Sequence, residues 1–174
     1  MNIILTGYRC TGKTSVGRLL AEMSGFPFFD TDEMVIRRRR KKIAEIVADE
    51  GWDAFRREES SAVRELSRQH SAVIATGGGA VLDPLNIKYL KENGFFVLLV
   101  AGAETIIERM KRDGEGRPSL SGKAISEEVP EMLAERESVY RQNADMIVDT
   151  ETLTETEVAS FIYSNLRNIM GQKP

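Results

Sequence analysis

A glycine-rich segment follows the first apolar run of the chain and precedes a pattern of helical period. It fits the spacing G-x-x-x-x-G-K-[ST] and reads Gly7-Tyr8-Arg9-Cys10-Thr11-Gly12-Lys13-Thr14. Between a strand and a helix, the main-chain N–H groups of such a loop surround phosphates, and the helix N-terminus adds partial positive charge. The segment therefore predicts a phosphate-binding P-loop. A chance glycine turn is the alternative, and the strand–loop–helix context argues against it.

The residues of this loop have separate roles in a P-loop that binds ATP. Lys13 is expected to reach the β- and γ-phosphates, and the Thr14 hydroxyl is expected to ligate the Mg²⁺ that bridges them. Cys10 is interpreted as a spacer and not as a reactive thiol. The residues expected to bind the nucleotide are Gly7, Arg9, Cys10, Thr11, Gly12, Lys13, Thr14 and Ser15.

Two carboxylates stand at the expected end of the second strand. Asp30-Thr31-Asp32 follows the apolar pair Phe28-Phe29, and ligands in open α/β sheets bind at the carboxyl ends of the strands. One carboxylate could organise the water shell of Mg²⁺ while the other accepts a proton from an attacking hydroxyl. Capping of the next helix by Thr31 or Asp32 is the alternative, and it is compatible with catalysis.

Arg56 and Glu59 are three residues apart in a helical pattern, so they share one side of the helix. Glu59 could hold the Arg56 guanidinium in place for bidentate capture of a substrate carboxylate. A solvated ion pair is the commoner fate of such residues, and the two residues alone favour that interpretation.

Three glycines, Gly77-Gly78-Gly79, come directly after another expected strand. Because they lack side chains, their main-chain N–H groups are open to close approach by a ligand. A flexible turn is the alternative, but the position at the end of a strand favours a role in binding.

Arg136 falls within the apolar stripe of its predicted helix, which Val129, Met132, Leu133 and Tyr140 form. A buried arginine is costly unless it is paired, so either a bound anion meets it or it extends past the stripe to solvent. The pattern favours neither interpretation.

Arg117 lies in the polar segment 113–118, which contains two glycines. Such a loop could close over ATP as a lid and place this arginine against the transferring phosphoryl group. An ordinary surface loop is the alternative.

The composition of the chain narrows these hypotheses. Its 174 residues suffice for one domain, and its net charge of −3 does not suit a nucleic-acid partner. No apolar run approaches the ~20 residues that span a bilayer, and a single cysteine fits a reducing compartment, so we expect a cytoplasmic protein. The basic run 37–42 is interpreted as a solvated helical segment, because no aromatic residues are interleaved with it.

Strands and helices are expected to alternate along the chain. Apolar runs predict strands at 2–6, 28–29, 71–75, 95–100 and 146–148. Helical spacing predicts helices after residue 12, over about 32–69, and at 85–92, 105–112, 126–142 and 158–170. This order predicts an α/β fold with a parallel sheet covered on both faces.

Taken together and in this order, the motifs resemble the shikimate kinase family over residues 2–168. The matching pieces are Gly7 to Thr14, Asp30-Thr31-Asp32, Phe55-Arg56-Arg57-x-Glu59, Gly77-Gly78-Gly79, Arg117-Pro118, and Arg136 followed by Tyr140. The resemblance implies a three-layer P-loop fold like that of nucleoside monophosphate kinases, with a five-stranded parallel sheet flanked by helices. It implies one kinase domain over 1–174, with a helical substrate-binding region at about 32–60 and a lid at about 112–124.

The reaction that this resemblance implies is transfer of the γ-phosphate of ATP to the 3-hydroxyl of shikimate by a monomer, in the shikimate pathway of aromatic amino-acid biosynthesis. Asp32 would bind the ring hydroxyls and help deprotonate the 3-hydroxyl, and Asp30 would assist Mg²⁺. Arg56 and Arg136 would clamp the shikimate carboxylate, with Glu59 orienting Arg56.

Further roles are implied by the same resemblance. Backbone groups of Gly77 to Gly79 would contact the substrate, and Arg109 is similar in position to the arginine that family members stack on adenine. The chain departs from the family at Ser119, where leucine usually follows Arg-Pro, and in the density of the basic run. A P-loop kinase for gluconate or a nucleoside monophosphate, and a nucleotide-binding module without transferase activity, are the alternative functions.

Overall fold

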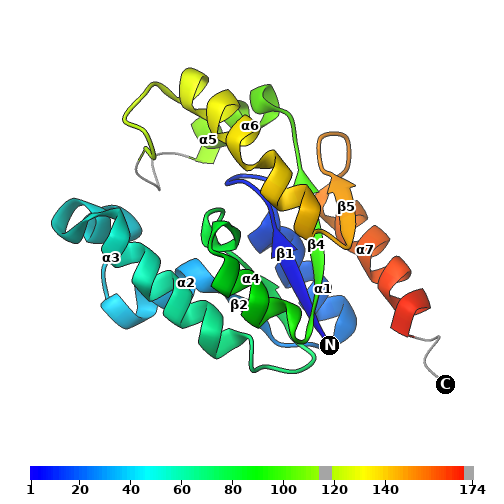
Figure 1. Ribbon diagram of the computed structural model, residues 1–174. Coiled ribbons are helices and arrows are strands. Elements are labelled where there is room, and N and C mark those ends of the chain that lie inside the picture. The colour runs from blue at the N-terminus through cyan, green and yellow to red at the C-terminus, as the bar shows by residue number, and fades with distance from the viewer. Residues whose placement is uncertain (114–118, 171–174) are drawn as a thin grey trace.

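The computed structural model describes residues 1–113 and 119–170, and strands alternate with helices along it (Figure 1). Within these ranges the strands form a parallel five-stranded sheet in the order β2-β3-β1-β4-β5, as predicted. The strands are β1 (Asn2–Thr6), β2 (Phe28–Asp30), β3 (Val73–Ala75), β4 (Gly94–Val100) and β5 (Met146–Asp149). The helices are α1 (Lys13–Ser24), α2 (Thr31–Arg39), α3 (Ile43–Leu66), the short 3₁₀ helix η1 (Ala80–Leu82), α4 (Pro84–Lys91), α5 (Ala103–Asp113), α6 (Ile125–Asn143) and α7 (Glu155–Met170).

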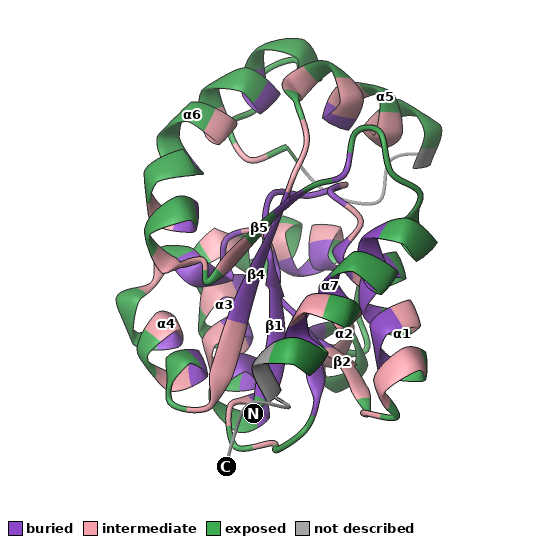
Figure 2. Cartoon of the chain, turned by 90° about the vertical axis from the view of Figure 1, so that its right-hand side faces the viewer, coloured by how far each residue is buried: buried purple, intermediate pink, exposed green. Residues whose placement is uncertain are grey.

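Successive side chains of a strand point to opposite faces of the sheet, and helices cover both faces. On one face, Ile3 and Leu5 of β1 pack against α1 and α7. On the other, Ile4 of β1 and Phe96 of β4 pack against α3, α4 and α6. Figure 2 shows the buried strands between α1 and α7 on one side and α3 and α4 on the other. Burial on both faces explains why the strands read as continuous apolar runs in the sequence.

The single helix predicted over 32–69 was wrong, since two helices occupy that range. Helix α2 ends at Arg40, which takes a left-handed conformation (φ 52) that interrupts a right-handed helix. Helix α3 is kinked at Gly51 (φ 82, ψ 169), a position where glycine accepts a backbone angle that other residues disfavour. The two helices enclose a small core of their own around Val35 and Ile46.

The basic run at the end of α2 is matched by acidic residues of α3. Arg38 contacts Glu65, and Arg39 contacts both Glu50 and Glu58. In the link between the two helices, Lys41 Nζ lies 2.8 Å from Asp49 Oδ2 of α3. Pairs this close to solvent contribute about 0–1 kcal/mol each, so the shared apolar core of α2 and α3 is the larger part of their packing.

The carboxyl ends of the three strands on one side of the sheet lie in register. Ala75 of β3 is paired with Leu5 of β1 on one side and with Asp30 of β2 on the other. The three segments that follow these strands therefore leave the same edge as close neighbours. No helix within the described ranges has both the length and the apolar character needed to cross a membrane.

Candidate active site

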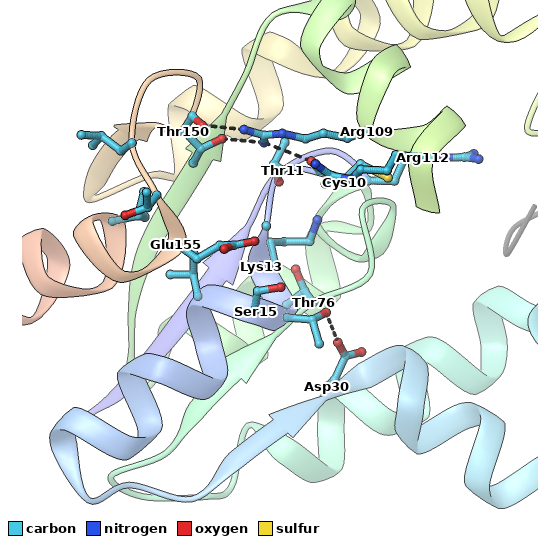
Figure 3. Close-up of a pocket in the computed structure, with 17 residues that line it drawn as sticks. Cys10, Thr11, Lys13, Ser15, Asp30, Thr76, Arg109, Arg112, Thr150 and Glu155 are labelled. Atoms are coloured by element: carbon cyan, nitrogen blue, oxygen red, sulfur yellow. Dashed lines mark hydrogen bonds between the residues drawn. The ribbon is translucent and has the colours of Figure 1, made fainter. Parts of the chain in front are cut away.

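The loop between β1 and α1 forms one wall of a cavity of about 520 Å³, a size that suits a nucleotide. The backbone is left-handed at Cys10 (φ 59) and Gly12 (φ 91), a conformation typical of loops whose N–H groups bind anions. A Cβ at Gly7 (φ 133) would overlap the Leu99 carbonyl oxygen, so this position needs glycine. The Lys13 Nζ donates a hydrogen bond to the Tyr8 carbonyl oxygen at 2.6 Å. In Figure 3 the Lys13 side chain points into the space between Arg109 and Asp30.

Thr14 and Asp30 place two oxygen ligands together at the base of this cavity. The Thr14 hydroxyl donates to Asp30 Oδ2 at 2.9 Å. The other Asp30 oxygen accepts from the backbone N–H groups of Asp32 (2.9 Å) and Glu33 (3.3 Å), so Asp30 caps α2. The predicted capping by Thr31 or Asp32 was therefore wrong by one or two residues. Oxygen donors of this kind are those that Mg²⁺ prefers, and the pair fits that ion.

Arg109 joins the P-loop to the segment after β5, on the opposite side of the cavity. Its guanidinium donates to the Thr150 carbonyl (2.6 Å) and hydroxyl (3.0 Å) and to the Cys10 carbonyl (3.3 Å), as Figure 3 shows. Thr150 was not predicted, although it follows a strand at the edge where ligands bind. Other lining residues that were not predicted are Val16, Thr76, Arg112, Leu153, Thr154, Glu155 and Val158.

A second, much smaller cavity of about 30 Å³ adjoins the P-loop. We call it the acceptor cavity; it is lined by Arg9, Asp32, Ile43, Trp52, Phe55, Arg56, Glu59, Gly77, Gly78, Gly79, Leu120 and Arg136. The residues predicted to bind the acceptor thus come together from four separate segments. Of the described residues, Arg9 lines both this cavity and the larger one.

Arg56 and Glu59 form an ion pair across one turn of α3. Glu59 is only 1% exposed and the Arg56 side chain is 33% exposed, so the pair is half-buried and not the fully solvated one that the two residues alone favoured. Trp52 and Phe55 lie 5.4 and 5.3 Å from the Arg56 guanidinium, measured to their ring centroids. Trp52 was assigned to the core, and it does pack against the α2–α3 core, but it also forms a wall of the acceptor cavity. The Arg56 guanidinium is therefore held on three sides.

None of the three glycines after β3 has a left-handed φ, and two of them, Gly77 and Gly79, are required by space. A Cβ at Gly77 would overlap the Glu59 carboxylate and lie 2.7 Å from Asp32 Oδ1. A Cβ at Gly79 would overlap the Arg56 guanidinium. The prediction that all three N–H groups are open to ligand was wrong for Gly77, whose N–H donates to Thr31 Oγ1 at 2.8 Å. The glycines instead let charged side chains approach the loop.

Gly79→Ala is expected to displace the Arg56 guanidinium and so to weaken acceptor binding. Loss of a charge-assisted hydrogen bond predicts a rise of about 10-fold or more in the KM of the acceptor. The KM of ATP should change little, because neither residue lines the larger cavity. Steady-state kinetics with each substrate varied in turn will measure this. Gly78→Ala is the matched comparison, since a Cβ there would meet the Gly7 carbonyl oxygen at an ordinary 3.4 Å; equal losses in both variants would contradict the overlap.

Arg136 of α6 turns into the acceptor cavity, so the alternative that it extends past the apolar stripe to solvent was wrong. It is 9% exposed, and its guanidinium carbon lies 5.7 Å from the centroid of the Tyr8 ring. One turn later, the Tyr140 hydroxyl donates to the Gly78 carbonyl oxygen at 2.5 Å. Burial raises the pKa of Tyr140, which keeps this hydroxyl protonated as a donor at neutral pH. Helix α6 thereby positions both Arg136 and the loop of Gly77 to Gly79, called the glycine loop below.

Arg117, predicted to meet the transferring phosphoryl group, lies outside the described residues. Ser119, the departure noted in the sequence, contacts the buried carboxylate of Glu128 through its hydroxyl.

The described part of the site can hold a triphosphate and a divalent ion on one side of Arg9. On the other side it presents a carboxylate, Asp32, and two arginines to a second ligand. This arrangement suits transfer of a phosphoryl group to a small anionic acceptor.

Comparisons with known proteins agree with this geometry. The family model described as shikimate kinase matches residues 9–167. A protein of Syntrophus aciditrophicus named shikimate kinase is 44% identical over 183 residues, covering 99% of this chain and 92% of the relative. Among solved structures, shikimate kinase from Acinetobacter baumannii in complex with shikimate has a TM-score of 0.90 and 34% identity, covering 99% of this chain and 94% of that one. Shikimate kinase from Aquifex aeolicus has a TM-score of 0.81 and 33% identity, covering 98% and 99%. The match of the family model and the identity along nearly the full length show that this chain belongs to the shikimate kinase family.

Proposed function

We propose that this protein transfers the γ-phosphate of ATP to the 3-hydroxyl of shikimate, giving shikimate 3-phosphate and ADP. One observation carries the proposal: Asp32, Arg56 and Arg136 line a single cavity that meets the P-loop cavity at Arg9. Two arginines suit a carboxylate, and a buried aspartate suits a hydroxyl that must lose a proton. The similar protein from Acinetobacter baumannii was solved with shikimate, a small carboxylate of this kind.

On the nucleotide side, the P-loop N–H groups and Lys13 hold the phosphates, and Arg109, which lines the same cavity, stacks on the adenine base. Thr14 and Asp30 would hold Mg²⁺, which would supply positive charge to balance the phosphates of ATP. These residues bind and orient ATP without forming a covalent intermediate, so positioning and electrostatics supply the rate enhancement.

On the acceptor side, Arg56 and Arg136 bind the carboxylate of shikimate, with Glu59 fixing the Arg56 guanidinium and the glycine loop contacting the ring through its backbone. Asp32 takes the proton of the 3-hydroxyl as that oxygen attacks the γ-phosphorus. A cavity of about 30 Å³ does not admit a six-membered ring, so some of its walls have to move outward when shikimate binds. Contact of Arg117 with the transferring group, as part of a lid at about 112–124, stays a prediction.

The direct test mixes the protein with MgATP and shikimate and looks for shikimate 3-phosphate by mass spectrometry. Product formation is expected, and removal of Mg²⁺ with a chelator should stop it. Gluconate and a nucleoside monophosphate serve as comparison acceptors, because a kinase for either of them is the alternative enzymatic function. Faster phosphorylation of either one, or ATP binding without any phosphorylated product, would contradict the proposal. The predicted monomer in the cytoplasm stays a prediction, which light scattering and cell fractionation can check.

A further inference from the structure

Glu128 is a buried carboxylate near the start of α6 that is not among the described residues lining either cavity. Its Oε2 accepts hydrogen bonds from the backbone N–H groups of Leu120 (2.7 Å) and Ser121 (2.9 Å). The same oxygen accepts from the hydroxyls of Ser121 (3.0 Å) and Ser119. Its other oxygen, Oε1, lies 3.6 Å from Arg9 Nη2. One carboxylate therefore joins the P-loop to the segment 119–121.

The charge of Glu128 is maintained by these contacts. Burial alone would raise the pKa of the carboxyl, but the hydrogen bonds from Ser119, Ser121 and Leu120 outweigh it and lower the pKa. The group is therefore ionised at neutral pH. A buried charge is tolerated only when it is paired and hydrogen-bonded, and four donors and one arginine fulfil that condition here.

The partners of Glu128 are walls of the site. Leu120 lines the acceptor cavity, and Arg9 lines both cavities at the point where they meet. The Arg9 side chain is 8% exposed and that of Glu128 is 2% exposed, so the pair is shielded from solvent and from salt. A shift of Glu128 would therefore move both the Arg9 guanidinium, where the two cavities meet, and Leu120, which is an apolar wall of the acceptor cavity.

We propose that Glu128 is a positioning residue that couples acceptor binding to nucleotide binding through Arg9. The inference rests on the proposed function. A nucleotide attracts the Arg9 guanidinium on one side, and Glu128 keeps that guanidinium over the acceptor cavity on the other. Coupling of this kind is reciprocal, so each ligand raises the affinity for the other. Ser119 contributes a hydrogen bond to Glu128 that a leucine at this position could not donate.

The test measures the dissociation constant of shikimate with and without saturating MgADP, by calorimetry or intrinsic fluorescence. The wild-type protein should bind shikimate about 5-fold or more tightly when MgADP is present, the lower range of measured allosteric coupling. Glu128→Gln keeps the shape and loses the charge, so this ratio should fall toward 1. Glu127→Gln is the matched control, an exposed glutamate one residue earlier on the same helix, and it should keep the wild-type ratio.

Two further variants guard the test against a purely structural effect. Ser119→Ala removes one hydrogen bond to Glu128 from an exposed residue and should lower the ratio partway, which decides the question if Glu128→Gln does not fold. In a double-mutant cycle, Arg9→Met with Glu128→Gln should lose no more coupling than Arg9→Met alone, because Glu128 acts through Arg9. An unchanged ratio in Glu128→Gln and Ser119→Ala, or additive losses in the cycle, would overturn the inference. If the wild-type protein forms no shikimate 3-phosphate, the proposed function fails instead.

Discussion

Asp32→Asn is expected to lower turnover by about 10²- to 10⁴-fold, the usual contribution of a positioned acid or base. Asparagine has the size of aspartate, but it cannot take the proton of the attacking hydroxyl. Asp32 is 5% exposed and lines the acceptor cavity but not the nucleotide cavity, so ATP binding should persist. A coupled assay for turnover and calorimetry with MgADP will measure the two effects separately.

Asp53→Asn is the matched control for this change. Asp53 is an exposed aspartate beside Trp52 on α3, and the same substitution there should leave turnover near the wild-type value. Full turnover in Asp32→Asn would remove this residue as the base and leave it at most an orienting role. Loss of nucleotide affinity together with turnover would instead indicate that the cap of α2 had been disturbed, since Asp30 accepts the backbone N–H of Asp32.

Arg136→Ala should weaken shikimate binding by about 10- to 100-fold, which corresponds to the loss of hydrogen bonds to a charged group. Arg136 lines the acceptor cavity and not the nucleotide cavity. The KM of ATP should therefore change far less than the KM of shikimate. Initial rates with each substrate varied at saturating levels of the other will show the difference.

Two companion variants make the interpretation of Arg136→Ala specific. Arg136→Lys keeps the charge but not the planar pair of donors, so it should restore only part of the affinity. Arg141→Ala removes an exposed arginine of the same helix that is paired with Glu137, and it should have little effect on either substrate. Equal losses for ATP and shikimate in Arg136→Ala would argue against a carboxylate clamp.

Much of the fold could be predicted because its determinants are local. The P-loop is contiguous, and each strand is a short apolar run that a glycine or an aspartate ends or follows within two residues. The break between α2 and α3 was not predicted, because the helical pattern continues through it. It depends on the backbone angle of Arg40, which no side-chain periodicity reports.

The sequence predicted those parts of the site that depend on neighbouring residues, but not those that depend on packing between distant segments. Arg56 and Glu59 are three residues apart, so their contact could be predicted, but their burial could not, because it depends on Trp52 and on the glycine loop that packs against them. Leu120 and Thr150 reach the cavities from distant segments and carry no local motif. The glycines after β3 were found from their position, while the reason for them, space for Glu59 and Arg56, required the packed structure.

Before shikimate binds, the acceptor cavity leaves little room for water, the nucleophile that competes with the shikimate hydroxyl. Water can attack the γ-phosphorus of ATP as an alcohol does. A kinase that admits water to the acceptor position would therefore hydrolyse ATP without phosphorylating its substrate. The acceptor cavity on one side of Asp32 is about 30 Å³, which admits about one or two water molecules. The consequence is that few water molecules can stand where the acceptor hydroxyl would, beside Arg56 and Arg136, so we expect ATP hydrolysis without shikimate to be slow compared with phosphoryl transfer to it.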